Sequence, residues 1–259
     1  MIIILTQCFP SRIGGIESLV ENLSLELSKN SQVLVLADQH NKIKDSLYDK
    51  GVKKNLIIKR FGGIKFLRKR LKLYHLKKIL ISNKIKCVIG DSWKSFELTI
   101  DLINKESIPT ICLAHGNELI AKNKSYNSRV NLTMNKISQI VCNSNFTLNL
   151  VKELDIKINK LTKIYPGAQN CMSFNEETIP NINGIPILMT LARLEKRKGH
   201  EFILSAVGKL KTYYPDIKYI IAGSGYELQN LKTIVKNFDI QKNHINILTH
   251  QLNNLHSFY

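Results

Sequence analysis

Short apolar segments alternate with helix-like segments along most of the chain, and this alternation limits the fold more than any other feature. In the first two thirds of the chain, strands are predicted at residues 2–6, 32–37, 56–61, 87–90, 110–114, 139–143 and 160–165. Helical periodicity marks residues 16–29, 65–83, 96–105, 129–137 and 145–154. Strands that are apolar throughout and separated by helices are typical of a parallel sheet covered on both faces. The sequence therefore predicts an α/β fold.

The pattern breaks after Tyr165, where Pro166 and Gly167 end the seventh apolar segment. Residues 171–184 are polar and rich in turn-forming Pro, Asn and Gly. A second alternating series follows, with strands expected at 185–190, 218–222 and 245–248 and helices at 199–213 and 225–237. We expect a first domain at 1–170, a linker at 171–184 and a second domain at 185–259. Because doubly wound sheets usually have five or six strands, the second domain is expected to be incomplete.

Positive charge is concentrated in one part of the chain, whose formal net charge is +18. Residues 53–86 contain thirteen Lys and Arg and no acidic residue, a field that could attract nucleic acid, an anionic membrane or an anionic substrate. Ile64, Leu67, Leu71 and Tyr74 recur at helical spacing there, which predicts a basic amphipathic helix. Such a helix either docks on an anionic membrane or presents a solvated face. Regular aromatic interleaving and nucleic-acid motifs are missing, so we expect no nucleic-acid partner.

The chain begins with the apolar stretch MIIIL, which is too short for a secretory signal or a membrane span. Its cysteines are odd in number and scattered, with no CxxC pair and no His at metal-ligand spacing. We interpret them as free thiols in a reducing compartment and expect no metal. The expected location is the cytoplasm, with a possible peripheral position at the inner face of the membrane.

Two glycine-rich turns lie between a predicted strand and a predicted helix. Gly14 and Gly15 follow the first strand, where missing side chains let a backbone approach a ligand, although a tight turn would need the same residues. Gly223 and Gly225 flank Ser224 in the second series and indicate either a phosphate loop or a tight turn.

Polar residues follow two further predicted strands. His115, Gly116 and Glu118 lie at the carboxyl end of the fifth strand, where ligands bind in parallel sheets. Glu118 could accept hydrogen bonds from sugar hydroxyls or pair with His115, and an ordinary helix-capping loop is the equal alternative. In residues 143–147, NSNFT, the polar side chains favour a structural role as caps of the helix that follows.

The stretch LARLEKRKGHEFI places four cations immediately before a predicted helix at Gly199. The amino end of a helix carries a partial positive charge, so cations there predict an anionic ligand such as a diphosphate. Arg193 and Lys198 are expected to converge above Gly199, one as a planar fork and one as a compact charge. Lys196 and Arg197 are expected to be solvated.

Together these motifs resemble those of the GT-B glycosyltransferases of glycosyltransferase family 4, also called glycosyl transferases group 1. The resemblance rests on GGIE (14–17), HGNE (115–118), NSNFT (143–147), YPGAQ (165–169), RLEKRKG (193–199) and IAGSGYELQNLK (221–232). It implies two doubly wound Rossmann-like domains, the first for the acceptor and the second for a nucleotide sugar.

The resemblance also implies roles for individual residues. His115 would lie beside the anomeric carbon of the donor sugar as the catalytic residue, and Glu118 would contact acceptor or sugar. Gly14, Gly15, Arg193 and Lys198 would bind the donor diphosphate. Gly199, Gly223 and Gly225 would form supporting turns. Such enzymes transfer sugar with retention to a glycan or lipid-linked acceptor, generally without a metal or other cofactor, which here implies synthesis of cell-envelope polysaccharide or glycolipid.

The sequence departs from the family pattern in three places. Ala192 stands where a Gly commonly precedes the Arg, YPGAQ is a loose form of the interdomain turn, and no two glutamates have the family's spacing of i and i+8. The resemblance implies that this pair would follow soon after Tyr259, which predicts a chain truncated at its carboxyl end. The alternative is a catalytically incomplete remnant or a subunit that binds acceptor or membrane.

Overall fold

The computed structural model describes residues 1–52, 54–82, 84–120, 123–154, 156–167, 183–237 and 245–248. The chain forms two compact units, Met1–Gly167 and Ala168–Tyr259. Residues 171–182 of the predicted linker lie outside the described residues.

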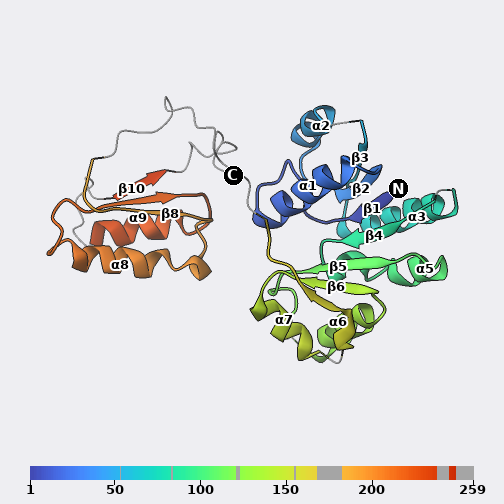
Figure 1. Cartoon of the computed structure of the whole chain (residues 1–259). Coiled ribbons are helices and arrows are strands. Elements are labelled where there is room, and N and C mark those ends of the chain that lie inside the picture. The colour runs from blue at the N-terminus through green and yellow to red at the C-terminus, as the bar shows by residue number, and fades with distance from the viewer. Residues whose placement is uncertain are drawn as a thin grey trace. The chain divides into compact units, whose positions relative to one another are not determined.

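A parallel sheet of seven strands, in the order β3-β2-β1-β4-β5-β6-β7, forms the centre of the first unit (Figure 1). Its strands are β1 (Ile2–Leu5), β2 (Val33–Asp38), β3 (Leu56–Phe61), β4 (Cys87–Gly90), β5 (Thr110–Ala114), β6 (Gln139–Cys142) and β7 (Leu161–Lys163). Side chains that alternate along β1 enter opposite cores: Ile3 and Leu5 enter one, and Ile2 and Ile4 the other. The expected parallel sheet with two covered faces is confirmed.

Helices connect these strands. They are α1 (Gly15–Ser28), α2 (Lys42–Lys50), α3 (Lys65–Ser82), α4 (Trp93–Phe96), α5 (Ile100–Lys105), α6 (Lys124–Asn135), α7 (Asn145–Lys152) and the short 3₁₀ helix η1 (Ile158–Lys160). The single helix predicted at 96–105 is wrong, because the chain forms α4 and α5 with a turn between them. Glu97 in this turn forms ion pairs with Lys69 and Arg129.

Helix α2 is absent from the sequence predictions, and its burial pattern explains the omission. Ile43 and Leu47 are exposed, and the only residue of the helix that is buried is Asp45. The Asn41 side chain caps the helix by accepting hydrogen bonds from the backbone N–H groups of Ile43 (3.1 Å) and Lys44 (3.0 Å). A helix that buries an aspartate has no apolar stripe for periodicity to detect.

The second unit contains a parallel sheet in the order β10-β9-β8, among the residues that the structure describes. Its elements are β8 (Ile187–Leu191), the 3₁₀ helix η3 (Lys196–Lys198), α8 (His200–Leu210), β9 (Lys218–Ala222), α9 (Leu228–Asn237) and β10 (Ile245–Leu248). Helices α8 and α9 lie side by side along one face of this sheet (Figure 1). Leu204, Leu231 and Tyr219 bring these elements into one core.

Candidate active site

The carboxyl ends of β1, β4 and β5 lie next to one another in the first unit. From β1 the chain adds strands first toward β3 and later toward β7, so the strand order reverses between β1 and β4. In parallel sheets the crevice at such a point is where ligands bind. Thr6 and Gln7 follow β1, Asp91 follows β4 and His115 follows β5, so polar residues meet at this edge.

Asp91 is the buried centre of this group, with 3% of its surface exposed. Its Oδ2 accepts hydrogen bonds from the Thr6 hydroxyl (2.8 Å) and the Gln7 backbone N–H (2.9 Å), and its Oδ1 accepts one from the Ser95 hydroxyl (2.5 Å). Asp91 was not predicted as a site residue from the sequence. It could have been found there as an acidic residue directly after an apolar segment, in the same position relative to its strand as His115.

The imidazole of His115 is held by a backbone carbonyl. Its Nε2 lies 2.9 Å from the carbonyl oxygen of Asp91. Because a carbonyl oxygen only accepts hydrogen bonds, Nε2 must carry the proton of this contact. In the neutral ring Nδ1 is then the acceptor. The structure therefore fixes both the orientation and the tautomer of the ring.

Glu118 closes the turn that carries His115. Its Oε1 accepts a hydrogen bond from the backbone N–H of His115 at 2.7 Å. Its backbone carbonyl accepts hydrogen bonds from the Trp93 indole (3.1 Å) and the Tyr126 hydroxyl (2.8 Å). Glu118 and His115 therefore interact, as the sequence allowed, but the carboxylate of Glu118 binds the backbone N–H of His115. This carboxylate oxygen supports the position of the histidine.

Gly116 and the NSNFT segment form one packed unit. Gly116 has φ 109°, and a Cβ there would lie 3.2 Å from the Thr147 hydroxyl oxygen. The Thr147 hydroxyl donates to Asn143 Oδ1 (2.7 Å), and its backbone N–H donates to the Ser144 hydroxyl (3.1 Å), which caps α7. The structural role that the sequence favoured for residues 143–147 is thereby observed.

Gly14 and Gly15 lie at the start of α1 in geometry that other residues can adopt. Gly14 is extended, with φ 168°, and Gly15 is the first residue of the helix. A Cβ on Gly15 would meet no atom within 4 Å, and the residue is exposed. Neither glycine is in the left-handed conformation, and no neighbouring atom would crowd a side chain at Gly15. The loop is open to a close ligand, as the binding alternative requires.

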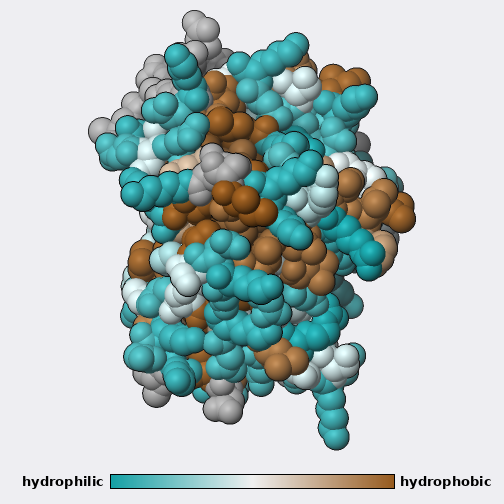
Figure 2. All heavy atoms as spheres, turned by 90° about the vertical axis from the view of Figure 1, so that its right-hand side faces the viewer, coloured by the Kyte–Doolittle hydropathy of each residue, from teal (hydrophilic) through white to brown (hydrophobic). Residues whose placement is uncertain are grey.

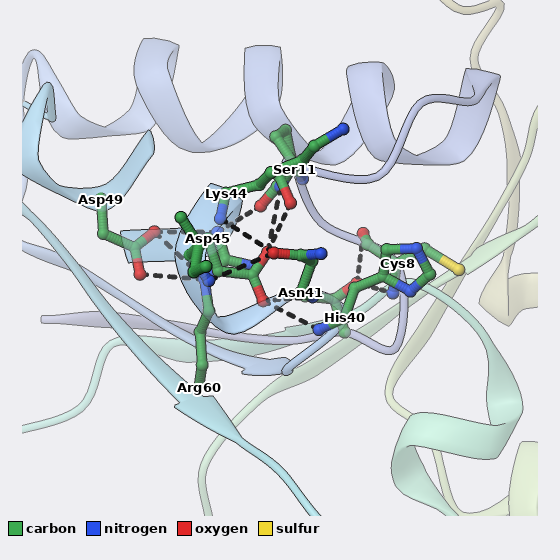
Figure 3. Close-up of polar contacts among 11 residues, drawn as sticks. Cys8, Ser11, His40, Asn41, Lys44, Asp45, Asp49 and Arg60 are labelled. Atoms are coloured by element: carbon green, nitrogen blue, oxygen red, sulfur yellow. Dashed lines mark hydrogen bonds and ion pairs between the residues drawn. The ribbon is translucent and has the colours of Figure 1, made fainter. Parts of the chain in front are cut away.

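A buried ion pair holds the loop that precedes these glycines (Figure 3). Asp45 Oδ1 accepts a hydrogen bond from the Ser11 hydroxyl (2.7 Å) and lies 3.2 Å from Nη1 of Arg60, while Oδ2 accepts from the His40 N–H (2.8 Å). Arg60 also pairs with Asp49 and donates to the carbonyl of Pro10. Burial by itself raises the pKa of Asp45, but the hydrogen bonds and the guanidinium charge lower it below its ordinary value.

Cys8 lies in the same loop and is half-buried. Burial, helped by the negative charges of Asp91 and Glu17, raises the pKa of its thiol to about 12. Glu17 is buried and forms an ion pair with Arg12 (2.9 Å between Oε1 and Nε), so the acidic residue of GGIE also holds the loop. Cys8, Cys87, Cys112 and Cys142 are free thiols.

In the second unit the loops after β8 and β9 are packed backbone against backbone. Leu194 N–H donates to the Ser224 carbonyl (2.9 Å), and Glu227 N–H donates to the Leu194 carbonyl (3.1 Å). A Cβ on Gly225 would lie 2.8 Å from the carbonyl carbon of Leu194, and one on Gly223 would lie 3.0 Å from that of Ala192. Both glycines therefore permit this close approach, which fits the supporting role expected for them.

The cation cluster surrounds the junction between η3 and α8. Gly199, in the left-handed conformation with φ 71°, separates these two elements. Arg193 and Lys198 are exposed, and the carbonyl of Arg193 accepts a hydrogen bond from Nε2 of the buried His200 (3.0 Å). Lys196 and Arg197 are exposed, as expected, and Arg197 also donates a hydrogen bond to Glu195 at 2.7 Å. Glu195 Oε1 also lies 3.7 Å from Nη1 of Arg193.

The residues that the structure describes contain no group of three or more His, Cys, Asp or Glu side chains that could hold a metal ion. No helix within the described ranges is long and apolar enough to cross a membrane.

Profiles of two protein families match the chain. Residues 175–259 match the profile described as Glycosyl transferases group 1, and residues 13–169, more than half of the chain, match Glycosyltransferase Family 4. The chain belongs to glycosyltransferase family 4. As a member of this family it is a glycosyltransferase, as the motifs implied. A search among curated protein sequences found no match.

Solved structures share the fold of this family 4 chain at low sequence identity. HepE of Anabaena in complex with UDP has a TM-score of 0.76 and 14% identity, over 96% of this chain and 68% of that one. A glycosyltransferase of Rickettsia africae has a TM-score of 0.72 and 17% identity, over 99% of this chain and 70% of that one. The lipopolysaccharide outer core galactosyltransferase WaaB has a TM-score of 0.65 and 12% identity, over 98% of this chain and 70% of that one. These likenesses confirm the expected GT-B type of fold.

Proposed function

We propose that this chain transfers a sugar from a nucleotide-diphosphate donor to a glycan or lipid-linked acceptor with retention at the anomeric carbon. The first unit holds the acceptor and the second holds the donor. The observation that carries this proposal is the pair of packed loops after β8 and β9, which present Arg193 and Lys198 at the carboxyl edge of a parallel sheet. The structure of HepE with bound UDP supports it, since that protein has the same fold.

The leaving diphosphate is the species that Arg193 and Lys198 stabilise. Cleavage of the bond to the anomeric carbon places an additional negative charge on the diphosphate, and positioned cations stabilise that charge in the transition state. Gly14 and Gly15 leave space for the phosphates to approach the amino end of α1. The turns at Gly199, Gly223 and Gly225 position the backbone that carries Arg193 and Lys198. We propose that this charge stabilisation takes the place of a divalent cation.

His115 is proposed as the catalytic residue beside the anomeric carbon. Its ring is fixed through Nε2 by the Asp91 carbonyl, which leaves Nδ1 to accept a hydrogen bond from a hydroxyl of the donor sugar. The Glu118 carboxylate accepts a hydrogen bond from the backbone N–H of His115. We propose that the same carboxylate also contacts the acceptor or the sugar.

The acceptor is proposed to belong to cell-envelope polysaccharide or glycolipid synthesis, in the cytoplasm or at the inner face of the membrane. WaaB, named for lipopolysaccharide, shares the fold. Apolar patches interrupt the hydrophilic surface in Figure 2. On α3 and just before it Ile64 is 73% and Phe66 63% exposed, and Leu67, Leu71 and Tyr74 are also exposed. This stripe is the surface that we propose for docking on an anionic membrane.

The cations of α3 do not all serve that surface. Arg68, Lys69 and Lys72 form ion pairs with Asp38 or Glu97 within the first unit, at 2.5 to 2.8 Å. Arg70 is exposed and stacks over Phe66, 4.3 Å from its ring centroid. A membrane test therefore uses Phe66→Ser with Leu67→Ser, and sedimentation with vesicles of phosphatidylcholine with and without phosphatidylglycerol. Binding that depends on the anionic lipid and is lost in the double variant supports docking, and unchanged binding refutes it.

Calorimetry with UDP, GDP and ADP tests the donor site in the whole chain. We expect Arg193→Ala to weaken binding of the preferred nucleotide at least about tenfold, a free-energy change of about 1.4 kcal/mol. Arg197→Ala is the matched control, because it removes the same charge from a neighbouring exposed side chain that we do not place in the donor site. Failure of the folded chain to bind any nucleotide would remove the basis of the proposal.

A further inference from the structure

A hollow at the carboxyl edge of the first sheet contains an excess of positive charge. The hollow is partly open to solvent and lies between α3, the ends of β1 and β2 and the residues around α4. Its lining includes Lys65, Lys69, Lys72 and Lys94 and a single carboxylate, Asp38. Lys69 and Lys72 have carboxylate partners, and the charges of Lys65 and Lys94 are the excess that predicts attraction of an anionic ligand.

The ammonium of Lys72 is the innermost of these cations. Its Nζ lies 2.5 Å from Asp38 Oδ1 and donates to the carbonyl oxygen of Thr6 at 2.6 Å, and 12% of the side chain is exposed. Burial lowers its pKa below the ordinary value although Asp38 acts in the opposite direction. Lys72 therefore places a positive charge at the inner end of the hollow, where its own contacts are to Asp38 and to the Thr6 carbonyl.

The remaining lysines differ in how they are compensated. Lys69 pairs with Glu97 at 2.8 Å, and that glutamate also pairs with Arg129. Lys65 is exposed and Lys94 is half-buried, with the Nζ of Lys94 6.0 Å from the ring centroid of Trp93. Neither has a carboxylate within 4.0 Å among the residues that the structure describes. These two side chains can bind a ligand without breaking an existing ion pair.

The hollow adjoins the proposed catalytic group through shared residues. Gln7 and Ser95 line the hollow, and both donate hydrogen bonds to the carboxylate of Asp91, whose carbonyl fixes His115. A ligand held by the lysines would therefore lie next to the position proposed for the reacting sugar. This places the anion on the acceptor side of the reaction, in the unit proposed to hold the acceptor.

We infer that this hollow binds a phosphate group of the acceptor, so that the acceptor is a phosphorylated sugar or a lipid phosphate rather than a neutral glycan. The inference rests on the proposed function, because that function assigns the first unit to the acceptor. Several ammonium groups around one space suit a compact, multiply charged anion whose oxygens can take several donors.

Titration of the whole chain with inorganic phosphate, with UDP already saturating, tests this inference. Trp93 is the chain's single tryptophan and lies beside Lys94, so its fluorescence reports binding together with calorimetry. We expect Lys94→Gln to weaken phosphate binding at least about tenfold and Lys65→Gln with Lys94→Gln to abolish it. Lys77→Gln, an equal loss of charge on α3 outside the hollow lining, should leave binding unchanged.

The outcomes separate this inference from the proposed function. A chain that binds UDP but not phosphate, or that loses phosphate binding equally in Lys77→Gln, overturns the inference alone. A chain that binds no nucleotide overturns the proposed function instead.

Two further probes identify the source of the phosphate. For a lipid acceptor, binding to vesicles that contain phosphatidic acid, a phosphate monoester, should fall in Lys94→Gln and be competed by inorganic phosphate. For a soluble acceptor, glucose 6-phosphate should bind more tightly than inorganic phosphate, and Lys94→Gln should remove that binding. Either result supports the inference, and insensitivity of both probes to Lys94→Gln refutes it.

Discussion

Substitution of Gly225 by alanine should unfold the second unit at a much lower temperature than the first. The new Cβ would lie 2.8 Å from the carbonyl carbon and 2.9 Å from the amide nitrogen of Leu194. The first distance is shorter by about 0.7 Å than a favourable carbon contact. Leu194 is fully buried, so neither its backbone nor its side chain can move outward freely.

The expected cost follows from what must shift. Overpacking in a fixed environment costs about 2 kcal/mol. Moving Leu194 also disturbs its backbone hydrogen bonds with Ser224 and Glu227, worth about 1 kcal/mol each. A total of about 4 kcal/mol corresponds to a fall of the unfolding temperature by about 15 to 30 °C in a unit of this size.

Two probes distinguish the units. Trp93 is buried in the first unit, so its fluorescence follows unfolding of that unit alone. Hydrogen exchange of peptides that contain β8 and β9 follows the second. Gly15→Ala is the matched control, since its Cβ meets no atom within 4 Å and should leave both probes unchanged. Native exchange of β8 and β9 in Gly225→Ala would refute the packing argument.

Three further perturbations test the first unit, each followed by urea unfolding monitored through Trp93. Asp45→Asn should lower the free energy of unfolding by about 3 kcal/mol at neutral pH. Because the folded pKa of Asp45 lies below its ordinary value, the carboxylate contributes its full stabilisation above about pH 4 and loses it as the pH falls. The stability of the variant should therefore fall less steeply in acid than that of the natural chain. Ser144→Ala should cost about 1 kcal/mol through loss of the α7 cap, and no change would contradict the capping role. Gly116→Ala, at φ 109°, should cost about 2 kcal/mol and lower turnover through His115 while UDP binding is retained; full turnover would show that the turn does not position the histidine.

Much of the fold could be predicted from the sequence because its strands are short apolar segments separated by helical ones. The apolar segments at 56–61, 87–90, 110–114, 218–222 and 245–248 coincide with strands of the structure. Helix α2 could not be predicted, because the residue that anchors it is Asp45 and the partner that justifies burying a carboxylate is Arg60, which follows in β3. Apolar periodicity cannot reveal a helix that packs through an ion pair.

The sequence by itself predicted His115 and Arg193 after the carboxyl ends of strands and Lys198 at the start of a helix, because the order of elements along the chain fixes which residues follow each strand. Only the tertiary structure decided what those residues contact. It brought Asp91 under His115 through the pairing of β4 with β5, and it showed that Gly225 permits two backbones to meet. It also turned Lys65, Lys69 and Lys72 of α3 toward Lys94, which is far from them in the chain. Such contacts depend on which segments become neighbours in space, and sequence spacing does not contain that information.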